Sequence, residues 1–199
     1  MYMNNHIDRR ITKSKQALKG ALLSLMKEKD FKAIAITDIV QVANLNRGTF
    51  YKHYQYKDDL LEEIMDDVIA DLIESYREPY KGNENFDVKN LTSSAIKIFE
   101  HVDHYKEFYT LLQSSTLSGF QDKICLVLKE IALQDLFDML PDAVINRELL
   151  ASYHAFAIFG MIKEWINHQF KYSADYMAEQ LLAIVKHSQG MDNQSVKRL

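Results

Sequence analysis

The chain has 199 residues, of which 47% are hydrophobic and 26% charged, enough for one compact globular unit or for a small head joined to a larger body. Six glycines and two prolines supply too few turns for an all-β sandwich of this length, so long helices are favoured. The net charge of −4 is uneven: residues 1–60 contain 11 Lys and Arg against six Asp and Glu, a net +5, which leaves −9 for the remainder and suggests that the N-terminal part meets a polyanion.

The N-terminal part predicts four helices in close succession. The first covers residues 12–29, because apolar residues recur there every three or four positions on one face. A second covers residues 36–43 and a third covers residues 47–54, with a short turn between them. A long fourth helix starts near Lys57, because acidic residues in a first turn favour the positive end of the helix dipole.

Further helices follow a break at residues 79–83. Apolar periodicity places them at residues 88–102, 105–112, 120–139, 147–170 and 174–187. Ser173 is the expected N-cap of the last helix. No segment makes a convincing strand, so the sequence predicts an all-α fold of about nine helices.

Residues 34–61 predict a helix-turn-helix. The two helices in this stretch are too short to be stable alone and need support from outside. Apolar residues such as Ile39, Leu45 and Phe50 can supply it by packing onto the first and fourth helices.

The second short helix has a composition suited to DNA. Asn46 can cap its N-terminus, and Gly48 permits a close approach to phosphate. Around it gather side chains that commonly bind phosphates or enter the major groove: Arg47, Thr49, Tyr51, Lys52, His53 and Lys57. In any other helix these would be ordinary solvated groups; only their clustering favours DNA binding.

The same stretch resembles the tetracycline-repressor (TetR) family of bacterial transcription regulators. The family pattern is matched over about 30 residues by Ile36-Thr37-Asp38-Ile39-Val40 and Arg47-Gly48-Thr49-Phe50-Tyr51-Lys52-His53-Tyr54, then Lys57 and Leu60-Leu61. The resemblance implies a helix-turn-helix domain over residues 1–56 and a helical regulatory and dimerisation domain over residues 57–199. It also implies a regulator, commonly a repressor, that binds a palindromic operator on double-stranded DNA as a homodimer.

The resemblance assigns DNA-binding roles to nine residues: Thr37, Asn46, Arg47, Gly48, Thr49, Tyr51, Lys52, His53 and Lys57. Among them, Tyr51 and Lys57 would mostly bind phosphate, and Arg47 lies where the family reads bases. Two residues depart from the pattern. Ala35 stands where the family usually has a capping, phosphate-binding Thr, a loss that typically costs about 1 kcal/mol. Tyr56 stands where Ser or Asp often caps the fourth helix. Both departures concern operator affinity and not the fold.

The last two helices are apolar nearly all round and must be covered. In the TetR family such helices pair with their copies in a second chain. The resemblance therefore predicts a dimer interface at Phe156, Phe159, Gly160, Ile162, Lys163, Met177, Leu181 and Ile184. The alternative is that both helices only fill the core of one chain.

The central helices are rich in aromatic residues and histidines. The family often has a ligand pocket there, which predicts a small-molecule effector site lined by Phe99, His101, Tyr105, Phe108 and Tyr109. The alternative is that these side chains are core. His101 and His104 could share a helix face as metal ligands, but no Cys or carboxylate cluster completes such a site, so no metal is predicted.

The remaining expectations concern location and activity. Cys125 lies in an apolar run and is interpreted as a buried thiol, with redox sensing as the alternative; this usage fits a reducing cytoplasm. No apolar stretch reaches the roughly 20 residues that a bilayer requires, and residues 1–19 lack an apolar signal segment, so a cytoplasmic protein without membrane contact is predicted. No glycine loop or nucleophile motif indicates an enzyme or a cofactor. The alternative function is a co-regulator that keeps the fold but acts through a partner protein.

Overall fold

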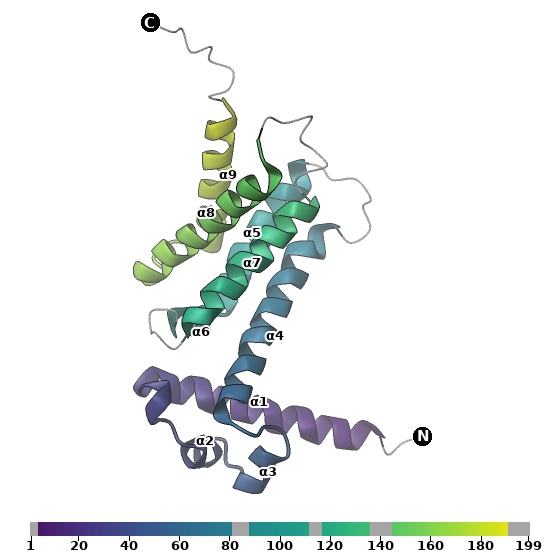
Figure 1. Ribbon diagram of the computed structural model, residues 1–199, viewed down its shortest axis with the longest axis vertical. Coiled ribbons are helices and arrows are strands. Elements are labelled where there is room, and N and C mark those ends of the chain that lie inside the picture. Colours follow the sequence, from purple (N-terminus) through teal and green to yellow (C-terminus); the bar gives the residue numbers. More distant parts are fainter. Residues whose placement is uncertain (1–3, 81–87, 112–116, 136–144, 191–199) are drawn as a thin grey trace, which may run out of the picture. The chain divides into compact units, whose positions relative to one another are not determined.

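The computed structural model describes residues 4–80, 88–111, 117–135 and 145–190, which form helices and connecting turns without a strand (Figure 1). This confirms the all-α prediction. The chain divides into two compact units, residues 1–68 with 111–118 and residues 69–110 with 119–199. The first unit thus extends into the long fourth helix, beyond the boundary before Lys57 that the sequence suggested.

The first unit contains α1 (Asn4–Glu28), the 3-10 turn η1 (Phe31–Ala33), α2 (Ile36–Val42), α3 (Arg47–Tyr51) and the start of α4 (Lys57–Arg77). α1 begins eight residues before the predicted start, because its first two turns are polar and give no apolar periodicity. α3 ends at Tyr51, three residues earlier than predicted.

The core of the first unit explains why the two short helices fold. Leu18 and Leu22 of α1, Ile39 of α2, Phe50 of α3 and Leu60 of α4 are all completely buried. Each helix therefore contributes one apolar face, and α2 and α3 gain from α1 and α4 the packing that helices of this length lack in isolation.

The second unit contains the rest of α4, η2 (Glu78–Tyr80), α5 (Val88–His104), α6 (Lys106–Thr110), nearly all of α7 (Ser118–Asp135), α8 (Arg147–Asn167) and α9 (Ala174–Gly190). α5 packs along α9. Phe99 and Trp165 meet edge to face in the core, with ring centroids 5.8 Å apart. Cys125 is buried, as predicted, and burial raises the pKa of its thiol.

The end of α8 and the start of α9 are fixed by local hydrogen bonds. Gln169 and Phe170 have positive φ angles of 53° and 54°, and the indole N–H of Trp165 donates to the carbonyl of Tyr172 at 3.0 Å. The Ser173 hydroxyl accepts the backbone N–H of Tyr176 at 3.2 Å, which confirms the predicted N-cap.

Some predictions fall outside the described residues. These are the end of the seventh predicted helix and most of the break at 79–83. Among the helices that are described, none combines the length and the apolar character needed to cross a membrane.

Candidate nucleic-acid interface

The turn between α2 and α3 is held by a backbone motif. Asn44 adopts a left-handed conformation with φ 52°, which asparagine tolerates better than most residues. The N–H of Leu45 donates to the carbonyl of Val40 at 2.8 Å, and that of Asn44 to Gln41 at 3.1 Å. This pair of bonds is the Schellman arrangement, which ends α2 and fixes the direction in which α3 leaves it.

The start of α3 is capped as predicted. Asn46 Oδ1 accepts the backbone N–H of Thr49 at 2.8 Å and its hydroxyl at 3.1 Å. A methyl group added at Gly48 would lie 3.2 Å from this oxygen, so a side chain there would crowd the cap. Glycine therefore keeps both the cap and the outer backbone of α3 accessible.

α3 has an inner and an outer face. Phe50 and, just after the helix, Tyr54 are buried against the unit, with ring centroids 5.6 Å apart. The opposite side, called here the outer face of α3, is exposed and consists of Arg47, Gly48, Tyr51 and Lys52. Its members were all predicted as DNA-binding, and the exposed fraction of Tyr51 is 52%.

The other predicted DNA-binding residues surround this face without all belonging to it. Thr37 on α2 is exposed, whereas Thr49 and His53 are half-buried. The Asn46 side-chain oxygen is occupied by the cap. The structure thus brings a cation, a phenol and open backbone to one exposed side of α3.

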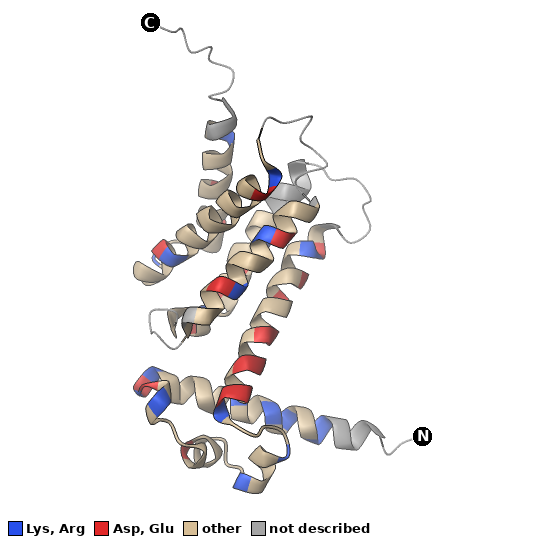
Figure 2. Ribbon diagram, in the orientation of Figure 1, with Lys and Arg blue, Asp and Glu red and all other residues tan. Residues whose placement is uncertain are grey.

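Exposed cations on α1 were not singled out from the sequence. Arg9, Arg10 and Lys13 lie exposed in its first half, and Figure 2 shows Lys and Arg along α1 and on α3, with Asp and Glu along α4. The excess of cations in residues 1–60 was the only signal that could have indicated them.

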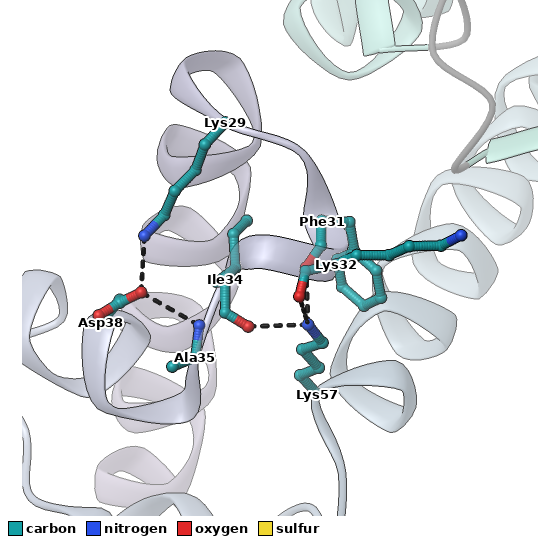
Figure 3. Close-up of polar contacts among 7 residues, drawn as sticks. All are labelled: Lys29, Phe31, Lys32, Ile34, Ala35, Asp38 and Lys57. Carbon is teal, nitrogen blue, oxygen red and sulfur yellow. Dashed lines mark hydrogen bonds and ion pairs between the residues drawn. The ribbon is translucent and has the colours of Figure 1, made fainter.

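The start of α2 compensates in part for Ala35. Ala35 has the extended conformation of an N-cap residue (φ −94°, ψ 154°), but its methyl group cannot accept a hydrogen bond. Asp38 Oδ2 accepts the backbone N–H of Ala35 at 3.1 Å and also the Lys29 amine at 2.6 Å (Figure 3). The hydrogen bond from Lys29, and then that from Ala35, hold the pKa of Asp38 below its usual value. One half of a capping box is present and the other is missing.

The start of α4 at Tyr56 shows the same half of a capping box. Asp59 Oδ2 accepts the backbone N–H groups of Gln55 at 2.9 Å and Tyr56 at 2.8 Å. Asp59 therefore satisfies backbone N–H groups at the entrance of α4, whereas a Ser or Asp at position 56 would accept N–H groups within its first turn.

Lys57 is placed differently from the prediction. Its amine donates to the backbone carbonyls of Phe31, Lys32 and Ile34 and lies 4.6 Å from the centroid of the Phe31 ring (Figure 3). The side chain is half-buried and turned onto the connection between α1 and α2. Lys57 was predicted to bind phosphate, and in this structure its amine is directed at backbone carbonyls of its own chain.

The five side chains predicted to line an effector pocket lie in the core of the second unit. Phe99, Phe108 and Tyr109 are buried. His101 Nδ1 lies 2.9 Å from Asp71 Oδ2 and its Nε2 lies 3.2 Å from the Tyr109 hydroxyl, while the Tyr105 ring packs at 4.8 Å. Burial lowers the pKa of His101, although Asp71 opposes this shift. The five residues are thus packed against one another and their neighbours.

The residues predicted for the dimer interface divide into two groups. Phe159, Ile162, Met177 and Leu181 are buried within their own chain, where they contribute to its core. The other four are exposed: Phe156, Gly160, Lys163 and Ile184. The apolar residues of α8 and α9 therefore lie on two faces, one in the core and one exposed. Because these helices are apolar nearly all round, their periodicity could not tell the two faces apart.

Together, a capped and exposed helix, a helix-turn-helix within residues 1–60 that carry a net charge of +5, and a second helical unit define a DNA-binding regulator. Known families agree. The model of bacterial regulatory proteins of the tetR family matches residues 19–64, and a TetR model described as a transcriptional regulator C-terminal region matches residues 89–187. The chain belongs to the TetR family of transcription regulators.

Individual relatives are similar over parts of their length. The HTH-type transcriptional regulator YxbF of Bacillus subtilis (strain 168) is 39% identical over 69 residues, 34% of this chain and 18% of that protein. The dhaKLM operon transcriptional activator DhaS of Lactococcus lactis subsp. lactis (strain IL1403) is 26% identical over 96 residues, 48% of this chain and 46% of that protein. The chain thus spans less than half of these curated relatives.

Solved structures show the same fold over most of the chain. A structure of DhaS superposes with a TM-score of 0.65 and 20% identity, covering 88% of this chain and 95% of that one. NalD, the secondary repressor of the MexAB-OprM multidrug efflux pump in Pseudomonas aeruginosa, gives a TM-score of 0.67 with 19% identity and covers 89% and 96% of the two chains.

Proposed function

We propose that the protein binds a palindromic operator on double-stranded DNA as a homodimer, represses transcription there, and is released by a small-molecule effector. The observation that carries the proposal is the outer face of α3. It presents Arg47, Gly48, Tyr51 and Lys52 to solvent on a helix whose inner face is locked into the core. A rigidly held helix with exposed cations is what insertion into a DNA groove requires.

Each side chain of the outer face has a separate role in this proposal. Arg47, in the first turn, reads a base edge, because side chains at the start of a recognition helix reach deepest into the major groove. Tyr51 and Lys52, one turn further along, bind phosphates and set the register. Gly48 lets the backbone approach the DNA closely. Thr37, Thr49 and His53 supply flanking contacts.

Dimerisation follows from the size of the helix and from an exposed stripe on α8. One five-residue helix binds weakly, whereas two that are related by a twofold axis and separated by about 34 Å read a palindrome. Leu149, Tyr153 and Phe156 are 71%, 62% and 59% exposed and, with Gly160, follow one another every three or four residues on one side of α8. α9 adds exposed Tyr176 and Ile184. We assign these residues, called here the α8–α9 stripe, to the dimer interface.

The direction of regulation is the least constrained part of the proposal. Repression needs only that the bound dimer excludes polymerase from its site, and NalD is named a repressor. DhaS is named an activator. Deleting the gene and measuring transcripts beside the operator decides between them: a rise supports repression and a fall supports activation.

Effector release is proposed at the buried aromatic group of α5 and α6. Because Phe99, Phe108 and Tyr109 are fully packed, a ligand there must separate rings that contact one another, which would shift the population between two arrangements of the second unit. An effector would raise the thermal midpoint of the free protein and lower its affinity for the operator. A compound library screened by both measurements tests this.

Selection of bound sequences from a random DNA pool is the main experiment. A twofold symmetric consensus supports the proposal, and recovery of no preferred sequence contradicts it. With the consensus known, Arg47→Ala should relax preference at one base position in each half-site, costing roughly 1–3 kcal/mol there. Lys52→Ala should weaken binding to all sequences by a similar factor. Equal losses on every sequence for Arg47→Ala would remove its base-reading role.

The co-regulator alternative drew on the missing cap at Ala35. Asp38 supplies the other half of the capping box at this helix start, which offsets part of the loss and lessens the support for this alternative. Binding to the selected DNA only in the presence of a second protein would restore it.

A further inference from the structure

We propose that Lys57 is a positioning residue: its amine anchors the entrance of the helix-turn-helix through three backbone carbonyls, and it is not a phosphate ligand. The proposal rests on the DNA-binding function proposed above, within which it reassigns a residue that the family resemblance places on phosphate.

The hydrogen-bonding capacity of the amine carries the argument. Lys57 Nζ lies 2.6 Å from the carbonyl oxygen of Phe31, 2.8 Å from that of Ile34 and 3.2 Å from that of Lys32. An ammonium group has three N–H donors and no more. Three carbonyls therefore take up all of them, and the Phe31 ring, 4.6 Å away, adds a cation–π contact. No donor is left for a phosphate oxygen.

The position of these carbonyls gives the anchor its consequence. Phe31 and Lys32 belong to η1, and the carbonyl of Phe31 also accepts the backbone N–H of Ile34 at 3.1 Å. Ile34 directly precedes Ala35, the N-cap of α2 that lacks a capping side chain. The Lys57 amine thus holds the chain just where a local cap is missing, and α2 in turn fixes the turn and α3.

Two further features agree with this role. Lys57 is the first residue of α4, where the positive end of the helix dipole disfavours a cation, and contact with three carbonyls offsets that cost. A second lysine acts on the same segment from the other side: Lys29 binds Asp38, which accepts the N–H of Ala35 (Figure 3). The entrance of α2 is held between two ammonium groups.

An anchor and a phosphate ligand differ in their salt dependence. Each phosphate contact that is lost reduces the slope of log K against log salt concentration by about 0.9. Loss of an anchor leaves the slope unchanged, because it lowers only the fraction of protein with α3 in the binding geometry. It therefore weakens operator and unrelated DNA by the same factor.

The test compares full-length Lys57→Met with Lys52→Met, a matched loss of one lysine from the outer face of α3. Dissociation constants are measured for the selected operator and for unrelated DNA at several salt concentrations, and the urea midpoint is measured without DNA. We expect Lys57→Met to lower the midpoint and weaken both DNAs on the order of tenfold with an unchanged slope. Lys52→Met should keep the midpoint and lose about 0.9 of the slope. A slope reduced by that amount in Lys57→Met, or an unchanged midpoint, would overturn the proposal.

A second measurement needs no destabilised variant. In the wild-type protein with ¹⁵N-labelled lysine, the Lys57 ammonium, assigned with Lys57→Arg, should give a slowly exchanging NMR signal that does not move when operator DNA is added. A signal that becomes protected only with DNA would contradict the anchor. If the selection recovers no operator, the urea midpoint and the free-protein signal still test the anchor, so the two proposals can fail separately.

Discussion

At the scale of single residues, Tyr54 carries a feature that packing alone does not explain. Its hydroxyl is buried and has no hydrogen-bond partner among the described residues, although the ring packs against Phe50 and lies under the Lys15 amine. Burial, and then the nearby Glu63 carboxylate, raise the pKa of the phenol, which stays neutral at any physiological pH. The Glu63 carboxylate lies near this hydroxyl, but its oxygens are taken by Lys15 and Lys19, so no hydrogen bond of normal geometry offsets the desolvation of the Tyr54 oxygen.

Tyr54→Phe should stabilise the protein. The ring contacts remain, and removal of the unpaired hydroxyl should raise the free energy of unfolding by about 1 kcal/mol in urea titration. Tyr51→Phe is the matched control, because Tyr51 is exposed and the same change there should leave stability unchanged. A loss of stability in Tyr54→Phe would mean that its hydroxyl makes a bond in solution.

Ala35→Thr should restore the missing half of the α2 cap. Ala35 is exposed and already has extended backbone angles, so a hydroxyl can reach the N–H groups of the first turn without rearrangement. We expect a gain of about 1 kcal/mol in the free energy of unfolding. Ala33→Thr, an exposed alanine of η1 outside the cap position, should give no gain. Equal effects of the two substitutions on the free energy of unfolding would show that the missing cap does not limit the stability of the protein.

At the scale of elements, α1 and α4 are joined by an ion network within the first unit. The Glu63 carboxylate accepts from Lys15 at 2.8 Å and pairs with Lys19 at 2.6 Å, and Lys19 also binds Asp67. Burial alone would raise the pKa of Glu63, but the hydrogen bonds from the two lysines outweigh it and lower the pKa to about 2. The network therefore favours the folded state only while Glu63 is ionised.

The pH dependence of stability follows from this shift. The folded pKa of Glu63, about 2, lies below the ordinary value of 4.5, so the folded state binds its proton less readily than the unfolded state does. The resulting stability is complete above pH 4.5 and is lost as the pH falls towards 2.

Glu63→Gln should remove this dependence. The side chains of the network are partly exposed, so the difference from wild type at pH 7 should be only about 1 kcal/mol and should shrink as the pH falls below 4.5. Urea titrations at pH 7, 5, 4 and 3 measure it. Glu28→Gln, an exposed carboxylate at the end of α1, is the control and should show no such trend. A difference that is constant with pH would contradict the role of the charge.

The elements also show what the sequence could predict. The approximate starts predicted for α2, α5, α8 and α9 agree with the structure, since breaks and capping residues are local signals. The residues of the outer face of α3 could also be predicted, because they lie within six positions of one another in the sequence. η1 and the role of Lys57 could not be predicted, because the carbonyls and the amine lie 23 to 26 residues apart and meet only in the folded unit. Likewise, only the tertiary packing shows which apolar residues of α8 and α9 lie in the core and which lie in the exposed α8–α9 stripe.

At the scale of the whole molecule, the proposed function requires two chains, because a palindrome would be read by two copies of α3. The α8–α9 stripe leaves Leu149, Tyr153 and Phe156 more than half exposed on the single chain. Large aromatic and aliphatic side chains that lie together on a surface mark an interface with another molecule. In a twofold dimer the same stripe meets its own copy, so one substitution alters the interface twice.

Phe156→Glu should therefore separate the dimer without unfolding the chain, because Phe156 is exposed in the single chain while its buried neighbour Phe159 keeps the core intact. The paired charges would oppose each other across the axis, and we expect dimerisation to weaken at least roughly 30-fold, as for an interface hot spot. Sedimentation equilibrium measures this, and the variant should bind a half-site as wild type does while losing affinity for the full palindrome. Leu126→Glu on α7, an equally exposed apolar residue outside the stripe, should remain dimeric. A Phe156→Glu protein that sediments as the wild-type dimer would place the interface on another surface, and Leu126→Glu would then be the first variant to compare with it.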